Sequence, residues 1–174
     1  DEAIKYLPKK DNEYLALAYG IKGMIYTNIE EYDKAISVYE KAIEKCPNDI
    51  NLYEKRAELY YRLGDYDLSD KDYDKIIKLD EGYITAYMGI GRNKSEQGLY
   101  DDAIKTFDYV IKLANDYSSA YSFRAECQIK KHNYNLAIDD ILKALSIDGD
   151  DKAFYLMVEL AQKNNSELLT KLKI

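Results

Sequence analysis

The residue best suited to acid–base catalysis in this sequence is His132, the single histidine of the chain. A catalytic histidine needs a nucleophile or a carboxylate held at hydrogen-bonding distance. His132 is followed by Asn133 in a short polar break, and Gly98 and Gly64 stand 34 and 68 residues before it. Glycine at equivalent positions is typical of a turn. We therefore expect His132 in a surface turn, and we predict no catalytic site and no enzymatic activity.

Three other groups of residues could hold a metal or a cofactor. Cys46 and Cys127 are far apart in the sequence, and with a single histidine the chain has no Cys–His cluster that could hold zinc. The pair Gly89 and Gly91 resembles part of a dinucleotide-binding loop but has no strand before it. The run 70–74, Asp-Lys-Asp-Tyr-Asp, resembles the start of a calcium loop but is followed by lysine where that loop needs glycine. We interpret this run as a solvated helix face, and we expect no metal and no cofactor.

The charge of the chain narrows the classes of partner. It has 174 residues with 32 acidic and 25 basic side chains interspersed, for a formal net charge of −7. Nucleic acid is disfavoured because a phosphate backbone is bound by a basic surface. No apolar run approaches the roughly 18 residues of a membrane span, so we expect no membrane partner. Unpaired cysteines suit a reducing compartment, which favours a cytoplasmic location.

Tyrosine recurs along the chain with a period of 34 residues. One series is Tyr19, Tyr53, Tyr87, Tyr121 and Tyr155, and a second is Tyr32, Tyr66, Tyr100 and Tyr134. Self-similarity at a fixed period of this size indicates a stacked array of repeats. We interpret most of the 19 tyrosines as residues that pack in the core or between helices, with the hydroxyl exposed to solvent at the edge of the core. A tyrosine-rich adhesive surface is the alternative.

Each repeat is predicted to contain two amphipathic helices joined by a tight turn. In the second repeat Tyr53, Ala57 and Tyr60 stand at i, i+4 and i+7, which is one face of a helix. Gly64 breaks this pattern, and a second periodic run follows over 66–79. The two cysteines would lie more than two repeats apart in such a linear array, so a disulfide bridge between them is excluded.

The pattern resembles the tetratricopeptide repeat family, in which small and aromatic positions recur in two successive helices. The first copy reads Tyr19, Lys22, Gly23, Tyr26, Ala35, Tyr39 and Pro47, and three more copies follow without an insertion. The resemblance implies an all-α fold, a right-handed superhelical solenoid of antiparallel helix pairs. We expect four full repeats, C-terminal capping helices and a partial N-terminal repeat.

The expected organisation has three parts. Residues 1–15 are a remnant of an upstream repeat or an N-terminal extension. Residues 16–151 hold four repeats, with expected boundaries 16–49, 50–83, 84–117 and 118–151. Residues 152–174 form a capping helix and a short terminal helix over 166–173, which folds over the cap or docks on a partner or a second copy.

Small residues mark the expected close approaches between helices. The positions are Gly23, Ala57, Gly91 and Ala125 within a repeat, and Ala35, Ser69, Ala103 and Ala137 between neighbours. A larger side chain at these places would overpack the crossing. Ser69 and Asp70 replace the Ala-Ile pair of the other repeats, so we expect loose packing where this helix begins.

The resemblance implies that the first helices of the repeats line a concave groove, the usual binding face of the family. The groove residues are apolar at the N-terminal end, at Leu17, Ile21 and Met24, and of mixed charge further on. The candidate partner-binding residues are Glu58, Tyr61, Arg62, Met88, Arg92, Glu96, Phe123 and Glu126. We expect Arg62 and Arg92 to pair with carboxylates of the partner.

One class of partner can be assessed from the residues that occupy the positions of a known binding clamp. Family members that bind the acidic tails of heat-shock chaperones hold the terminal carboxylate with two lysines, two asparagines and an arginine. In repeats one to three those positions carry Gly20, Met24, Lys55, Thr85 and Gly89, and in repeats two to four Glu54, Glu58, Gly89, Ser119 and Phe123. Neither set forms the clamp, so this tail is not an expected partner.

The sequence therefore predicts a non-enzymatic scaffold for protein–protein interaction, which binds a peptide or helix of a partner in the groove. The alternative is a self-associating structural module joined through its open ends or through the leucines of 166–173. A regulatory domain of an attached enzyme is a third possibility.

Overall fold

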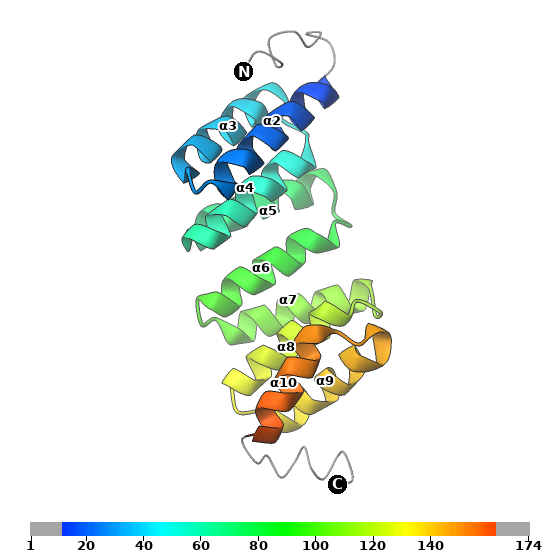
Figure 1. Ribbon diagram of the computed structural model, residues 1–174. Helices are drawn as coiled ribbons and strands as arrows, with labels where there is room; N and C mark the ends of the chain where they lie inside the picture. The colour runs from blue at the N-terminus through cyan, green and yellow to red at the C-terminus, as the bar shows by residue number, and fades with distance from the viewer. Residues whose placement is uncertain (1–11, 163–174) are drawn as a thin grey trace. The chain divides into compact units, whose positions relative to one another are not determined.

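The computed structural model describes residues 12–162 of the chain, which form nine α-helices and no β-strand (Figure 1). The helices are α2 (Asn12–Asn28), α3 (Tyr32–Lys45), α4 (Ile50–Leu63), α5 (Tyr66–Leu79), α6 (Ile84–Glu96), α7 (Tyr100–Leu113), α8 (Ser118–Lys130), α9 (Tyr134–Asp148) and α10 (Asp151–Gln162). The predicted all-α solenoid of helix pairs is confirmed. The repeat boundaries remain predictions.

The predicted breaks fall between the two helices of each pair. Tyr32, Tyr66, Tyr100 and Tyr134 are the first residues of α3, α5, α7 and α9. The turn before each of these helices contains one residue in the left-handed region, namely Glu30 (φ 62°), Gly64 (φ 80°), Gly98 (φ 76°) and His132 (φ 62°). The prediction of a turn at His132 is therefore confirmed.

His132→Gly is expected to leave the free energy of unfolding unchanged or to raise it by up to about 1 kcal/mol. A side chain is strained at this φ, and two sister turns already use glycine there. The loss of the contact between His132 Nδ1 and the Tyr134 hydroxyl, 2.8 Å apart, offsets part of the gain. Urea unfolding measures the change. His132→Ala is the matched control, because it loses the contact and keeps the strain, and it should be the less stable of the two.

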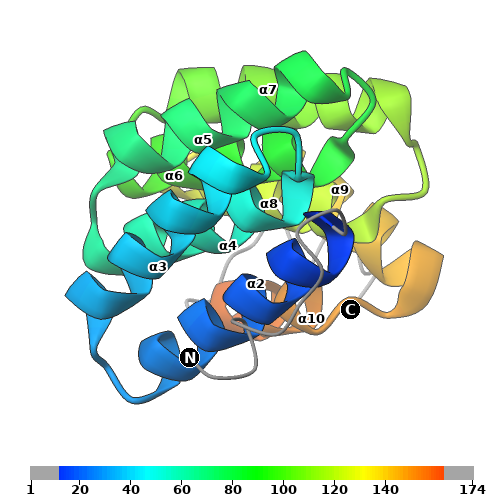
Figure 2. The same ribbon diagram turned by 90° about the horizontal axis from the view of Figure 1, so that it is seen from above.

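The chain divides into two compact units, Asp1–Gly89 and Ile90–Ile174. In the first unit α4 contacts α2, α3 and α5, and α2 packs against α3 (Figures 1 and 2). The core between these helices contains Ala16, Ala35, Tyr39, Ala42, Cys46, Leu52 and Leu59. Residues from α2, α3 and α4, together with Cys46 just after α3, thus share this core.

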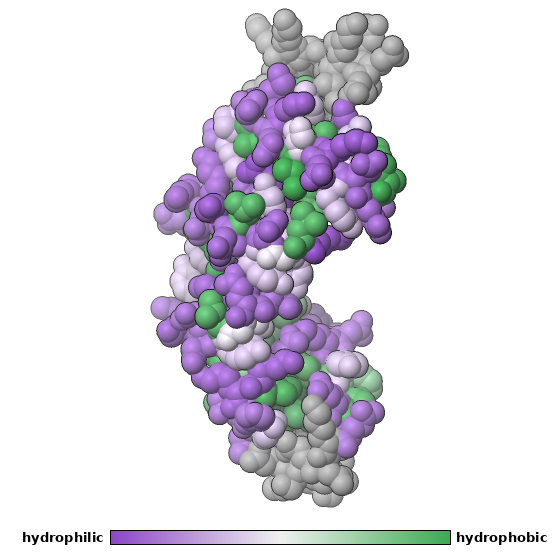
Figure 3. Space-filling view, turned by 90° about the vertical axis from the view of Figure 1, so that its left-hand side faces the viewer, coloured by the Kyte–Doolittle hydropathy of each residue, from purple (hydrophilic) through white to green (hydrophobic). Residues whose placement is uncertain are grey.

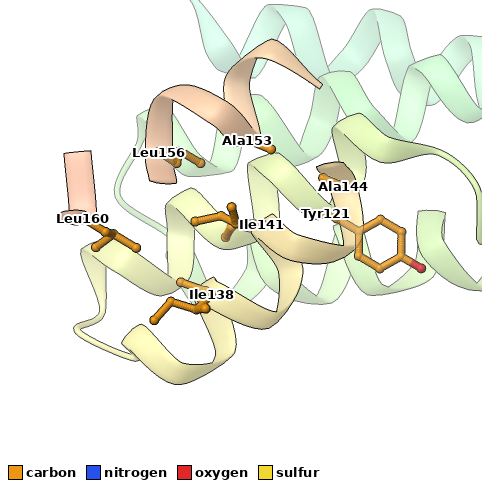
Figure 4. Packing of buried hydrophobic residues seen from close by; sticks show 9 residues of the cluster. Tyr121, Ile138, Ile141, Ala144, Ala153, Leu156 and Leu160 are labelled. Carbon is orange, nitrogen blue, oxygen red and sulfur yellow. The ribbon is translucent and has the colours of Figure 1, made fainter. Parts of the chain in front are cut away.

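In the second unit α8 contacts α7, α9 and α10, and α9 contacts α10. Figure 4 shows the shared core, in which Leu156 and Leu160 of α10 face Ile138 and Ile141 of α9. The first turn of α10 is capped by Asp150, whose Oδ1 accepts from the backbone N–H of Ala153 at 2.8 Å. Apolar packing and this cap together fix α10 on the preceding helix pair.

The small positions are buried as predicted. Gly23, Ala57, Gly91, Ala125, Ala35, Ser69, Ala103 and Ala137 all belong to the interior. Gly23 lies against the ring of Tyr39, and Gly91 lies against the ring of Phe107. Ser69 donates a hydrogen bond from Oγ to the carbonyl oxygen of Ala57 at 2.9 Å. The loose packing predicted at the start of α5 is therefore not observed, because the hydroxyl of Ser69 satisfies a buried carbonyl.

The tyrosines of the first series act as wedges with a polar tip. The hydroxyls of Tyr53, Tyr87 and Tyr121 each donate to the carbonyl oxygen six residues earlier, at 3.1 Å. In Figure 4 the hydroxyl of Tyr121 points away from the apolar cluster. Each of these rings therefore ties a first helix to the loop that precedes it, while the polar end remains at the rim.

Two buried ion pairs were not predicted. Arg56 binds Asp72 through two hydrogen bonds, Nε to Oδ2 at 2.8 Å and Nη2 to Oδ1 at 2.7 Å. Asp72 is only 4% exposed, so the solvated helix face expected for residues 70–74 is wrong at this position. Burial raises the pKa of Asp72, and the hydrogen bonds from Arg56 offset only part of that rise.

The second pair repeats the first at a distance of 68 residues in the sequence. Arg124 binds Asp140 from Nε at 2.8 Å and from Nη2 at 2.5 Å, and its Nη1 binds Asp108 at 2.5 Å. Burial raises the pKa of Asp140, and the hydrogen bonds to Asp140 are the main cause that raises the pKa of Arg124. The guanidinium thus joins α8 to both α7 and α9.

Several predictions concern segments outside the described residues. They are the upstream repeat or extension at the N-terminus and the leucine-rich helix over 166–173. Between residues 12 and 162 no helix is both long and apolar enough to cross a membrane. Within the described residues neither Cys46 nor Cys127 forms a disulfide, and both are buried.

Candidate protein-interaction face

The eight predicted binding residues lie on three first helices. In the first unit α4 carries Glu58, Tyr61 and Arg62, and α6 carries Met88; in the second unit α6 carries Arg92 and Glu96, and α8 carries Phe123 and Glu126. The residues of each unit are therefore described separately.

In the first unit the predicted residues differ widely in accessibility. Arg62 is exposed near the end of α4, and Glu58 is half-buried. The ring of Tyr61 lies 5.9 Å from the ring of Tyr66, centroid to centroid. Met88 is buried. Arg62 is thus the most accessible of these residues to a partner.

In the second unit three predicted residues come together around one ring. The ring of Phe123 has the guanidinium carbon of Arg92 at 5.7 Å and Nζ of Lys152 at 4.3 Å from its centroid. The ring of Phe123 also stacks on the ring of Phe107, with 5.8 Å between the two centroids. Glu126 accepts from Lys152 at 2.8 Å. The result is an aromatic platform with two cations beside it.

Lys152 was missed by the sequence analysis, although its helix was predicted. The helix that contains Lys152 was interpreted as a cap, so its polar residues were not considered for binding. The available signal was Tyr155, which continues the 34-residue series and indicates that this helix is equivalent to a first helix. Its exposed and half-buried residues could therefore have been added to the predicted face.

The apolar part of the predicted groove lies in the first unit, between α2 and α4. An open groove of about 410 Å³ is lined by Ala16, Leu17, Gly20, Ile21, Met24, Asp49, Asn51, Leu52 and Lys55. Leu17, Ile21 and Met24 are 60%, 47% and 43% exposed. The lining is thus mainly apolar, with Lys55 at the side contributed by α4.

A smaller and more polar hollow of about 290 Å³ lies where α8, α9 and α10 meet, and His132 lines it. Its other lining residues are Glu126, Ile129, Lys130, Tyr134, Lys152, Tyr155, Leu156 and Glu159. The histidine contacts the Tyr134 hydroxyl in its own turn. Among residues 12–162 no group of three histidine, cysteine or acidic side chains is placed to hold a metal.

Figure 3 shows another face of the molecule, on which hydrophobic residues form separate patches within a mainly hydrophilic surface. Isolated apolar residues of this kind are ordinary on a protein surface. The groove between α2 and α4 and the ring of Phe123 are better candidates, because several specific side chains converge at each.

Comparison with protein families gives three matches. The family described as TPR repeat matches residues 23–64, and two families described as Tetratricopeptide repeat match residues 50–83 and 88–152. These ranges include most of the described helices. No curated protein matches the chain.

Solved structures with the same arrangement of helices include three informative examples. The first TPR of Spaghetti (RPAP3), bound to the HSP90 peptide SRMEEVD, has 25% identity and a TM-score of 0.61, covering 67% of this chain and 93% of that one. MamA from Desulfovibrio magneticus RS-1 has 19% identity and a TM-score of 0.71, covering 91% and 93%. The second TPR domain of human RPAP3, in complex with the HSP70 peptide SGPTIEEVD, has 22% identity and a TM-score of 0.61, covering 67% and 98%.

Proposed function

Because the chain belongs to the tetratricopeptide repeat family, we propose that it is a scaffold that binds a peptide or helix of a partner protein on the face formed by its first helices. Proteins of this family and fold are generally non-enzymatic interaction modules, and we propose that this chain has no catalytic activity of its own. The Spaghetti domain bound to a peptide supports a protein partner, since it has 25% identity to this chain.

The observation that carries the proposal is the environment of Phe123. A half-buried aromatic ring offers a flat apolar contact, and Arg92 and Lys152 beside it attract carboxylates. Glu126 holds Lys152 at 2.8 Å when no partner is bound. A peptide with an apolar side chain and an acidic neighbour would match both features, because the ring and the cations lie side by side.

Affinity capture with purified variants tests this proposal. Phe123→Ala and Lys152→Ala are each expected to reduce recovery of the proteins that the wild type captures, by about tenfold or more if the ring is a binding hot spot. Lys152→Ala should keep the melting temperature, since its ion pair is partly exposed. Tyr109→Ala, an exposed aromatic on the second helix α7, is the control. Equal capture by all four proteins would contradict the proposal.

Binding of the acidic chaperone tail can be tested directly. The clamp residues are absent from the positions given above, so we expect the peptide SRMEEVD not to bind through its terminal carboxylate. Isothermal calorimetry with the free acid and with the C-terminal amide checks this expectation. Binding of the acid that is lost in the amide would show that another set of residues holds the carboxylate.

A further inference from the structure

The first helix of the described chain exposes six large apolar side chains, which are called the outer face of α2 below. They are Tyr14, Leu17, Ile21, Met24, Ile25 and Ile29, each between 43% and 60% exposed. The backbone N–H of Ile29 donates to the carbonyl oxygen of Ile25 at 3.1 Å, so Ile29 continues the turn of α2. Lys22 is the only charged residue between Tyr14 and Ile29. A helix that is apolar around most of its circumference is normally buried, so the outer face indicates a contact with another chain or segment.

The later first helices show what normally covers this face. Ile25 is equivalent to Leu59, Asn93 and Cys127, which stand 34, 68 and 102 residues later. Those three residues are at most 1% exposed, whereas Ile25 is 53% exposed. Leu59 belongs to the core shared with α2 and α3, and Cys127 donates from Sγ to Ser95 Oγ of α6 at 3.4 Å. Leu59 and Cys127 are thus buried against the preceding repeat, and no described helix covers Ile25 in the same way.

The residues just before α2 do not repeat the second helix that would cover this face. Pro8 stands 34 residues before Ala42, and the next equivalents are Ile76, Val110 and Ala144. All four of these later residues lie inside second helices and are fully buried. Proline has no backbone N–H to donate and breaks the interior of a helix. The sequence therefore favours an extension over an upstream repeat in this stretch, and the outer face needs another occupant.

The outer face is nearly symmetric about Ile21 along the helix. Leu17 and Ile25 stand four residues before and after Ile21, and Tyr14 and Ile29 stand seven before and eight after it. If two identical helices pack antiparallel with Ile21 at the two-fold axis, Leu17 of each copy meets Ile25 of the other. Tyr14 of each copy then meets Ile29 of the other. Apolar side chains face apolar side chains along the whole row, as a self-complementary interface requires.

The area of the outer face suits a dimer. A large side chain such as an aromatic buries about 200 Å², so six half-exposed side chains of similar size offer about 600 Å² in each copy. Two copies together would bury about 1,200 Å², which reaches the lower end of the range for specific protein–protein interfaces. Monomeric soluble proteins rarely expose an apolar patch of this size.

We infer that two copies of the chain associate through the outer face of α2 as an antiparallel, two-fold symmetric dimer. A second copy fits because it brings the same apolar side chains at the matching spacings, and because its row contains no charge that would have to be buried. The inference goes beyond the proposed function. It uses only residues of the first unit and does not involve Phe123 or Lys152.

Sedimentation equilibrium of the full chain between about 1 and 100 µM measures the association, since interfaces of ordinary size have dissociation constants of micromolar or below. The mass should rise from that of one chain toward that of two. Ile21→Glu and Ile25→Glu each place a carboxylate of both copies in the interface and should raise the Kd of the dimer about tenfold or more. Both positions are exposed, so the circular dichroism spectrum and the Tm should remain those of the wild type. Leu136→Glu, at a leucine of α9 that is 54% exposed, is the matched control and should dimerise as the wild type does.

Single cysteines test the antiparallel pairing. Ile21→Cys should form a disulfide-linked dimer on mild oxidation, because the two copies of residue 21 meet at the axis. Leu17→Cys alone should not, since its two copies would be eight residues, or about 12 Å, apart along the helices. A mixture of Leu17→Cys and Ile25→Cys should form the linked dimer. Cys46 and Cys127 are buried, so the wild type should stay unlinked on non-reducing electrophoresis.

Several results would overturn the inference. A wild type that stays monomeric up to about 100 µM would mean that the chain's own N-terminal residues or a different protein cover the outer face. Dimers that persist unchanged in Ile21→Glu and Ile25→Glu would use another surface. Species larger than a dimer, or equal linking of Leu17→Cys and Ile21→Cys, would exclude a closed antiparallel pair. The proposed function is judged separately, by Phe123→Ala and Lys152→Ala in the capture experiment.

Discussion

Replacing Arg124 with alanine is expected to lower the free energy of unfolding by about 3 kcal/mol near pH 7, the lower end of the range for breaking a buried ion pair. Arg124 makes two hydrogen bonds to Asp140 and one to Asp108. The side chain of Asp140 is only 10% exposed, so its charge would be left in the interior without a partner. Urea unfolding with global fitting of the transition measures the loss.

The stability that is lost in Arg124→Ala should become smaller as the pH falls. Burial raises the pKa of Asp140 in the folded protein, and Arg124 opposes that rise. Without Arg124 the folded pKa rises further above the unfolded value of about 3.9. The folded variant then binds more protons than the unfolded chain, so its stability increases as the pH falls from about 7 toward 4. The difference from the wild type should therefore become smaller in acid, and a difference that grows instead would contradict this account.

A double variant separates the effect of the unpaired charge from the effect of lost side-chain packing. Arg124→Ile with Asp140→Thr introduces the residues that stand 34 positions earlier, Ile90 and Thr106. Because both charges are removed together, it should be more stable than Arg124→Ala, and the double-mutant cycle gives the coupling. Lys105→Ala is the surface control. Lys105 pairs with Asp102 in an exposed bridge, so its loss should produce no measurable change.

These ion pairs show what the sequence could reveal and what was overlooked. The 34-residue period predicted the helix breaks, the small residues and the tyrosine wedges, because each recurs in nearly every repeat. The acidic and basic partners recur every second repeat, at Glu40, Arg56 and Asp72 and again at Asp108, Arg124 and Asp140. Glu40 also helps to raise the pKa of Arg56. A search at a period of 68 would have found this pattern.

The contacts of the candidate binding residues were predicted less completely than the fold, for a physical reason. A repeat pattern identifies positions by their place in a helix, and Phe123 and Arg92 are candidates on that ground alone. It does not give the contacts of an exposed side chain, which depend on rotamers and on neighbouring helices. Lys152 reaches the ring of Phe123 from α10, and no spacing in the sequence specifies that contact. The open space beside Gly20 likewise depends on how α2 and α4 approach each other.

Gly91→Leu is expected to destabilise the protein by about 3 kcal/mol, at the upper end of the range for overpacking. A Cβ at position 91 would lie 2.5 Å from Cε1 of Phe107. The ring cannot move away easily, because Phe107 is fully buried and stacks on Phe123. The helix must therefore shift on its partner α7, or the ring must leave its rotamer. Thermal and urea unfolding measure the change.

Gly91→Ala and Gly20→Ala form the matched pair that separates packing from helix propensity. Both glycines lie inside helices, where alanine alone is favoured by about 1 kcal/mol. At Gly20 the nearest atom to the new Cβ is 3.9 Å away, so Gly20→Ala should stabilise the protein by about that amount. At Gly91 the same methyl group meets the Phe107 ring, so Gly91→Ala should destabilise it despite the better propensity. If the two changes had the same sign, helix propensity would outweigh packing at Gly91, and the requirement for a small residue where these helices cross would be wrong.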